Sequence, residues 1–133
     1  FVIPDDVILC KNFIKKSIDL YNNIKDNRKV CLSLLSDDRV KAPNWTNTIP
    51  LDKGDVILTN WSDLCFICDK EFFKVVDMQP VDVDRWKYNL DLGSGVGSPN
   101  SKTLYRKGYN QYHVKESLVK HIGYKSQMNL DHY

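Results

Sequence analysis

The spacing of apolar side chains predicts a helix near the start of the chain. Over residues 6–25 they recur at intervals of three and four, at Val7, Cys10, Ile14, Ile18 and Tyr21. Such intervals gather side chains on one helix face. The preceding Pro4-Asp5-Asp6 suits a helix start, because proline fits the first turn and carboxylates favour the positive end of the helix dipole. We therefore expect residues 6–25 to form an amphipathic helix that packs one stripe onto a sheet.

Several later segments have the composition or the alternation of strands. Apolar and β-branched runs, and one stretch of alternating polarity, predict strands at residues 29–35, 56–59, 64–68, 72–78 and 85–92. A short helix is the alternative for residues 72–78. Thr103-Leu104-Tyr105 predicts a further short edge strand. The polar connection Asn60-Trp61-Ser62-Asp63 is short, and so predicts that the strands on either side of it form a hairpin.

Two loops and a second helix complete the expected order of elements. Proline and asparagine in residues 39–53 predict a long loop, and the Gly/Ser/Pro/Asn composition of residues 93–101 predicts another. Apolar residues at intervals of four over residues 113–122 predict a helix with Gly123 as its C-cap. The order shows no regular βαβ alternation. It predicts an α+β fold, a mostly antiparallel sheet of about five strands with an N-terminal and a C-terminal helix.

Length and composition are those of one ordinary globular domain. The chain has 133 residues, 42% apolar and 27% charged, which is enough apolar material for a core and argues against disorder. No apolar run approaches the length of about 18 residues that a membrane span needs. We expect residues 1–133 to be a single domain, and Phe1 in place of methionine indicates a piece of a longer protein.

The charge is unevenly distributed along the chain. Residues 1–83 carry 11 Lys and Arg against 13 Asp and Glu, whereas residues 84–133 carry 8 against 4. Six of the seven tyrosines also lie in the second part. Clustered cations attract phosphates, and aromatic rings offer surfaces on which bases stack. This combination favours a nucleic-acid-binding surface.

The candidate nucleic-acid-binding residues lie between Ser98 and Lys125. They are the cations and tyrosines Lys102, Tyr105, Arg106, Lys107, Tyr109, Tyr112, Lys115 and Lys120. Arg106 and Lys107 are the expected phosphate anchors. Lysine-rich helix faces and packed tyrosines are also common in proteins that bind no nucleic acid, so interaction with another protein stays open. For a nucleic-acid partner we expect an intracellular, nuclear location.

One glycine-rich segment resembles a known cofactor-binding motif. Leu90-Asp91-Leu92-Gly93-Ser94-Gly95-Val96-Gly97 is similar to the first motif of class I S-adenosylmethionine-dependent methyltransferases. The resemblance implies that these glycines approach the cofactor. The polar stretch from Ser98 to Lys102 differs from the apolar helix that follows the motif in that family, and only 36 residues remain after Gly97. A flexible loop is the simpler interpretation, and we expect no cofactor.

The cysteines allow three interpretations. Cys65 and Cys68 have the spacing of a zinc knuckle, and Cys31 with a histidine could complete a site. In a strand, however, side chains three residues apart point to opposite faces, which favours buried free thiols and no metal. A disulfide such as Cys10 with Cys31 is the third possibility.

Two sequons support an extracellular or virion-surface glycoprotein as the alternative function. They are Asn44-Trp45-Thr46 and Asn60-Trp61-Ser62, and a secreted protein could also use the disulfides. The three histidines have no sequence context that marks a nucleophile beside them. The sequence therefore predicts a binding domain without catalytic residues, and secretion is the alternative location.

Overall fold

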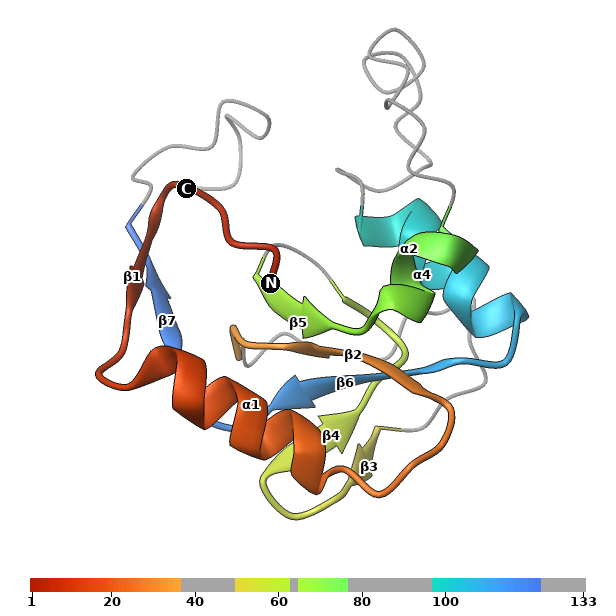
Figure 1. The fold of residues 1–133 in the computed structure, drawn as a ribbon, viewed down its shortest axis with the longest axis horizontal. Coiled ribbons are helices and arrows are strands. Elements are labelled where there is room, and N and C mark those ends of the chain that lie inside the picture. The colour runs from red at the N-terminus through yellow and green to blue at the C-terminus, as the bar shows by residue number, and fades with distance from the viewer. Residues whose placement is uncertain (37–49, 63–64, 77–96, 123–133) are drawn as a thin grey trace, which may run out of the picture.

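A five-stranded mixed sheet forms the centre of the computed structural model, which describes residues 1–36, 50–62, 65–76 and 97–122 (Figure 1). In spatial order the strands are β3 (Leu51–Asp52), β4 (Val56–Leu58), β6 (Asn110–Val114), β2 (Lys29–Ser33) and β5 (Phe66–Cys68). The two central strands, β6 and β2, are parallel, and the other neighbouring pairs are antiparallel. A separate two-stranded sheet pairs β1 (Val7–Leu9) with β7 (Val119–His121).

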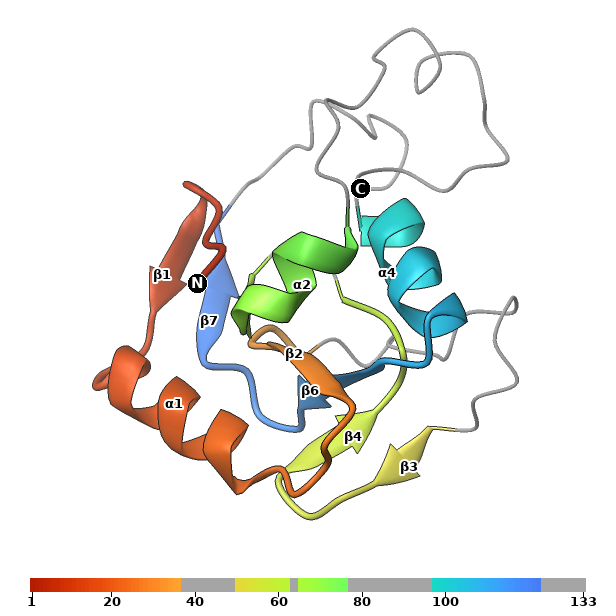
Figure 2. The same cartoon turned by 45° about the vertical axis from the view of Figure 1, so that its right-hand side comes forward.

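Helices cover both faces of the five-stranded sheet. On one face α1 (Phe13–Asn23) packs through Phe13 against a buried cluster that includes Leu32. On the other face α2 (Lys70–Val75) and α4 (Gly97–Arg106) contact each other (Figure 2) and share a second cluster with Val30. The sheet thus separates two apolar cores.

The α+β fold class predicted from the sequence is confirmed, but the placement of the helices is wrong. The five-stranded sheet is mixed: β2 and β6 run parallel, whereas its other three neighbouring pairs are antiparallel, as predicted for most of the sheet. The predicted terminal helices are wrong, because β1 precedes α1 and strands replace the second predicted helix. Of the residues described, no helix is long and apolar enough to cross a lipid bilayer.

The predicted helix over residues 6–25 exists only in its second half. Val7–Leu9 forms β1, and the helix starts at Phe13 after Asn12, whose φ of 59° is left-handed. A right-handed helix cannot continue through such a residue. At the other end Lys29 Nζ donates hydrogen bonds to the carbonyl oxygens of Tyr21 (2.6 Å) and Ile24 (3.1 Å), where α1 finishes.

The predicted strands at residues 29–35, 56–59 and 64–68 are confirmed in β2, β4 and β5, but the predicted hairpin is wrong. Two strands, β6 and β2, lie between β4 and β5 in the sheet. The connection does not turn back tightly, because Asn60 and Ser62 are buried and bonded to Gln111 of β6. These bonds hold the connection against the end of the sheet.

Three further segments differ from the assignment that the sequence favoured. In the apolar run at residues 72–78 the alternative, a short helix, forms in place of a strand: residues 72–75 belong to α2, whose N-cap Asp69 accepts hydrogen bonds from the N–H groups of Glu71 and Phe72. Thr103-Leu104-Tyr105 belongs to α4 instead of an edge strand. Residues 113–122 form the end of β6 and β7 instead of a helix.

The two predicted loops are shorter than expected where the structure describes them. Leu51–Asp52 forms β3 within the expected loop 39–53, and Gly97 begins α4 within the expected loop 93–101. Residues 39–49 and 93–96 of these loops, the predicted strand 85–92 and Gly123 lie outside the described residues.

Candidate nucleic-acid interface

Four of the predicted binding residues lie together on α4 and in the turn that ends it. Lys102, Tyr105 and Arg106 are on the last part of the helix, and Lys107 follows directly. The turn depends on Gly108, whose φ of 83° is left-handed and whose N–H donates to the carbonyl oxygen of Tyr105 (2.9 Å). Arg106 and Lys107 are both exposed. The chain then enters β6.

The hydroxyls of the two predicted tyrosines after this turn bond to carboxylates elsewhere in the fold. Tyr112 is only 3% exposed, and its hydroxyl donates to Asp26 (2.6 Å). Burial and the Asp26 carboxylate raise its pKa. The Tyr109 hydroxyl donates to Glu71 of α2 (3.2 Å). Both rings therefore have structural partners within the fold.

The last two predicted cations lie away from α4. Lys115 follows the far end of β6, where its ammonium group forms an ion pair with Asp52 of β3. Lys120 is on β7, opposite Ile8 in the two-stranded sheet. Figure 1 shows α4 and β7 at opposite ends of β6. The eight predicted residues therefore do not gather at one place in the fold.

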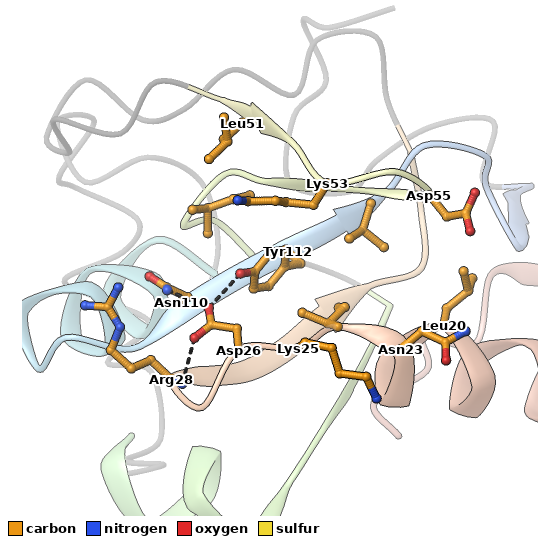
Figure 3. Close-up of a pocket in the computed structure, with 13 residues that line it drawn as sticks. Leu20, Asn23, Lys25, Asp26, Arg28, Leu51, Lys53, Asp55, Asn110 and Tyr112 are labelled. Atoms are coloured by element: carbon orange, nitrogen blue, oxygen red, sulfur yellow. Dashed lines mark hydrogen bonds between the residues drawn. The ribbon is translucent and has the colours of Figure 1, made fainter.

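A pocket of about 620 Å³ opens beside the start of β6 (Figure 3). It lies between the end of α1 and the β3–β4 turn. One part of its wall is aliphatic, from Leu20, Ile24, Leu51, Val56 and Leu58. The other part is polar, with Asn110 and Tyr112 of β6 beside Asp26 and Arg28. The pocket thus has an apolar side and a polar side.

Two cations border the polar side of the pocket. The Arg28 side chain extends beside Asn110, and the Lys53 side chain extends across the pocket wall that contains Tyr112 (Figure 3). The side chains of Lys25 and Asp55 point away from Tyr112. In the described part of the chain, neither Arg28 nor Lys53 has an ion-pair partner. Both charges therefore border the pocket mouth, and that of Arg28 also helps to lower the pKa of the neighbouring Asp26 carboxylate.

A backbone hydrogen bond holds the main chain of Arg28 beside the start of β6, close in the chain to Lys107. The N–H of Asn110 donates to the carbonyl oxygen of Arg28 (2.8 Å), and Asn110 follows Lys107 by three residues. Arg28, Lys53, Arg106 and Lys107 are referred to below as the basic rim. Arg28 and Lys53 were not among the residues predicted from the sequence, because no local motif marks them. The β2–β6 pairing places Arg28 at the pocket, and the β3–β4 turn places Lys53 there.

Of the two carboxylates that line the pocket, Asp26 and Asp55, that of Asp26 is held by three hydrogen bonds. Asp26 accepts them from the Tyr112 hydroxyl (2.6 Å), the Asn110 side-chain amide (2.7 Å) and the N–H of Arg28 (2.8 Å). Partial burial alone would raise the pKa of Asp26, but these hydrogen bonds outweigh burial and hold the pKa below its ordinary value. Asp26 therefore stays ionised and fixes β6 to the loop that carries Arg28.

The lowered pKa of Asp26 predicts a loss of stability in acid. Its contribution is complete above the pKa of an unfolded aspartate, about 3.9, and is lost as the pH falls through the lower pKa of the folded state. We expect the urea midpoint of the native protein to fall more steeply than that of Asp26→Asn below about pH 5. Exposed Asp5→Asn is the matched control, and equal slopes for Asp26→Asn and the native protein would contradict the assignment.

The sequon at Asn60 is poorly placed to carry a glycan. Asn60 is 4% exposed, and its side-chain oxygen accepts a hydrogen bond from the N–H of Gln111 (3.1 Å). A glycan attached to the side-chain nitrogen would require this segment to leave the sheet. Asn44, in the other sequon, lies outside the described residues.

All four thiols are free, and Cys65 and Cys68 pack on opposite faces of the sheet, as the spacing predicted. Cys10 packs on the α1 side and Cys31 on the other, so the structure does not form the bridge considered between them. Among the described residues, no group of three or more His, Cys, Asp and Glu side chains could hold a metal ion.

Gly93, Gly95 and their neighbours in the methyltransferase-like motif lie outside the described residues, and Gly97 begins α4.

Comparison of the chain with models of known protein families, with curated proteins and with solved structures found no match.

Proposed function

We propose that the protein binds nucleic acid through the basic rim, with phosphates held by Arg28 and Lys53 at the mouth of the pocket and by Arg106 and Lys107 at the end of α4. The observation that carries this proposal is the pair of cations on the polar side of the pocket, which have no ion-pair partner among the residues described. An intracellular, nuclear location fits this partner.

The chemistry of the pocket suits a ligand that is anionic on one side and apolar on the other. A phosphate between Arg28 and Lys53 would gain charge-assisted hydrogen bonds, since guanidinium and ammonium groups both donate to phosphate oxygens. The aliphatic wall that includes Leu51 and Leu58 offers apolar contacts to a sugar or a base. A nucleic acid repeats this combination along its length, which lets neighbouring phosphates reach Arg106 and Lys107.

The revised site differs from the one predicted from the sequence. Arg106 and Lys107 remain its anchors, and Lys102 and Tyr105 on the same helix end are close enough in the chain to contribute. Lys115 is engaged with Asp52, and Lys120 lies on the other sheet. Because Tyr112 is buried, the proposal depends on phosphate contacts more than on stacking.

A charge-reversal experiment tests this proposal. Fluorescence anisotropy with labelled single-stranded and duplex oligonucleotides, at two salt concentrations, should show binding that weakens as salt rises. The double variant Arg28→Glu/Lys53→Glu should bind at least about tenfold more weakly, because two attractive interactions with phosphates become repulsive. On a single strand, its dependence of log affinity on log salt should also be shallower, by about 0.7 for each phosphate that the variant no longer neutralises.

The matched control makes the same charge change elsewhere. Lys11→Glu/Lys16→Glu alters two exposed cations at the start of α1, outside the pocket. This control should retain most of the affinity. The proposal is wrong if the native protein does not bind, if binding is insensitive to salt, or if both double variants lose the same affinity.

A further inference from the structure

Cys31 and Cys68 are directly opposite each other in neighbouring strands. The antiparallel register of β2 and β5 pairs Cys31 with Cys68, Leu32 with Ile67 and Ser33 with Phe66. Both cysteines are free thiols. They therefore bring two oxidisable sulfur atoms to one position of the sheet.

The backbone hydrogen bonds on either side of Cys31 and Cys68 show which kind of antiparallel pair these two residues form. The Asp69 N–H donates to the Val30 carbonyl (3.4 Å), and the Leu34 N–H donates to the Cys65 carbonyl (2.8 Å). In an antiparallel ladder, hydrogen-bonded and non-hydrogen-bonded pairs alternate. Cys31 and Cys68 are the pair next to Val30 and Asp69, so they form a non-hydrogen-bonded pair.

Such a pair has the backbone separation that a disulfide requires. Its two Cα atoms lie about 4.5 Å apart, with the side chains closer than in the hydrogen-bonded pairs. Disulfides span Cα separations of roughly 4.4 to 6.8 Å. Both side chains are also on the same face, since Cys31 belongs to the cluster beneath α2 and α4 and Cys68 packs against that cluster.

The other two cysteines do not share this arrangement. Cys65 belongs to the cluster on the α1 face, and Cys10 packs against that same cluster. The sheet therefore separates both of them from Cys31 and Cys68. We propose that Cys31 and Cys68 form a dithiol pair, which a small disulfide such as oxidised glutathione converts into a cross-strand disulfide.

The more exposed thiol begins the exchange. The thiolate of Cys68, which is partly exposed, attacks one sulfur of oxidised glutathione, and a glutathione thiolate leaves. The buried Cys31 gives up its proton and attacks the Cys68 sulfur, which releases the second glutathione thiolate. The two protein thiols lose two electrons and two protons, and one molecule of oxidised glutathione becomes two of glutathione.

Burial makes this exchange slow at neutral pH. It raises the pKa of Cys31 to about 12 and also raises the pKa of Cys68, so little thiolate is present. We expect the rate of bridge formation to rise with pH. Because Cys31 is on a central strand and Cys68 is on a neighbouring one, the bridge would fasten β5 to the sheet.

Intact-mass measurement and peptide mapping of the full chain test the proposal. The folded protein is incubated with oxidised glutathione, and acid is then added to stop the exchange. The protein is unfolded in denaturant, its remaining thiols are alkylated, and it is digested without reduction. We expect a mass loss of about 2 Da before alkylation, for the two hydrogens removed, and one cross-linked peptide that joins Cys31 to Cys68. The bridged form should unfold at higher urea, and reduction should reverse this shift.

Single cysteine variants separate this pair from the others. Cys68→Ser should abolish the mass loss, and Cys10→Ser should retain it. Cys65→Ser is a second control on the same segment as Cys68. Four alkylated thiols in the treated native protein, a stable glutathione adduct on Cys68 without closure, or a bridge that includes Cys10 or Cys65 would each overturn the proposal.

Discussion

Replacing Gln111 with leucine is expected to destabilise the protein by about 3 kcal/mol. Gln111 is fully buried in β6. Its side-chain nitrogen donates to the carbonyl oxygens of Ser101 (3.0 Å) and Asn60 (3.2 Å), and its side-chain oxygen accepts from the Ser62 hydroxyl (2.9 Å). Leucine has a similar volume but leaves these groups without their partner, and each buried unsatisfied group costs about 1 to 3 kcal/mol.

Urea unfolding followed by circular dichroism measures this loss. Asn22→Leu, at an exposed position of α1, makes a similar change from amide to leucine without removing a buried partner. It should alter the free energy of unfolding by less than about 0.5 kcal/mol. If Gln111→Leu were as mild as this control, the network would not hold α4 and the β4–β5 connection to the sheet.

Replacing Phe72 with alanine should cost about 4 kcal/mol. The Phe72 side chain is 1% exposed in the cluster between the sheet and α2, and its ring centroid lies 5.0 Å from that of Phe66. Removing the ring sacrifices its burial and its aromatic contacts, and leaves a cavity that the short helix α2 cannot easily close. The two helices on this face should therefore loosen together.

The next residue on the same helix is a matched control. Phe73 is 47% exposed, and its ring packs edge-on against Phe72. Phe73→Ala deletes the same atoms, but should cost less than about 1.5 kcal/mol, because little area returns to water. The same unfolding measurements compare the two variants. Equal losses would mean that α2 does not bury the face that we describe.

The strands that the sequence predicts correctly carry their own local signals. In β2, β4 and β5 the apolar residues are short, β-branched or aromatic runs bounded by polar turns. The absence of βαβ alternation also gives the α+β class correctly. Which strands become neighbours could not be predicted, since the pairing of β2 with β6 joins residues about eighty positions apart.

The strand β6 was not predicted, and its last two residues fell within the expected helix over residues 113–122, because burial hides its alternation. It lies between β4 and β2, and four of its five residues are buried, including Gln111 and His113. Polar residues in a buried strand break the apolar pattern on which sequence analysis depends. Val114, Leu118 and Ile122 happened to have helical spacing, although a turn separates the first from the other two.

The helices α2 and α4 were missed for two different reasons. In α2 the spacing of Phe72, Val75 and Val76 fits a helix after the N-cap Asp69, but a short apolar run fits a strand equally well. In the part of α4 whose side chains the structure describes, residues 100–106, Ser101 and Leu104 are the fully buried residues, so a mainly polar sequence shows no apolar stripe. Tertiary contacts, more than local pattern, determine both elements.

The candidate site could be predicted only in part. Arg106 and Lys107 belong to a basic segment that is visible in the sequence, whereas Arg28 and Lys53 lie in a part of the chain that is slightly acidic overall. The β2–β6 pairing brings Arg28 beside Asn110 at the start of β6, whereas Lys53 comes from the β3–β4 turn, whose Asp55 accepts a hydrogen bond from the N–H of Lys115 at the other end of β6. A local charge count cannot find cations that reach one pocket from separate segments.

Mapping an oligonucleotide onto the protein by nuclear magnetic resonance tests the central claim most directly. In a titration of isotope-labelled full chain with a short single-stranded oligonucleotide, we predict that the amide signals of Arg28, Gly54, Asn110 and Lys107 shift first and saturate together. Signals near Lys120 on β7 should not move. Shifts confined to β7 and the start of α1, or no shifts at all, would contradict the account.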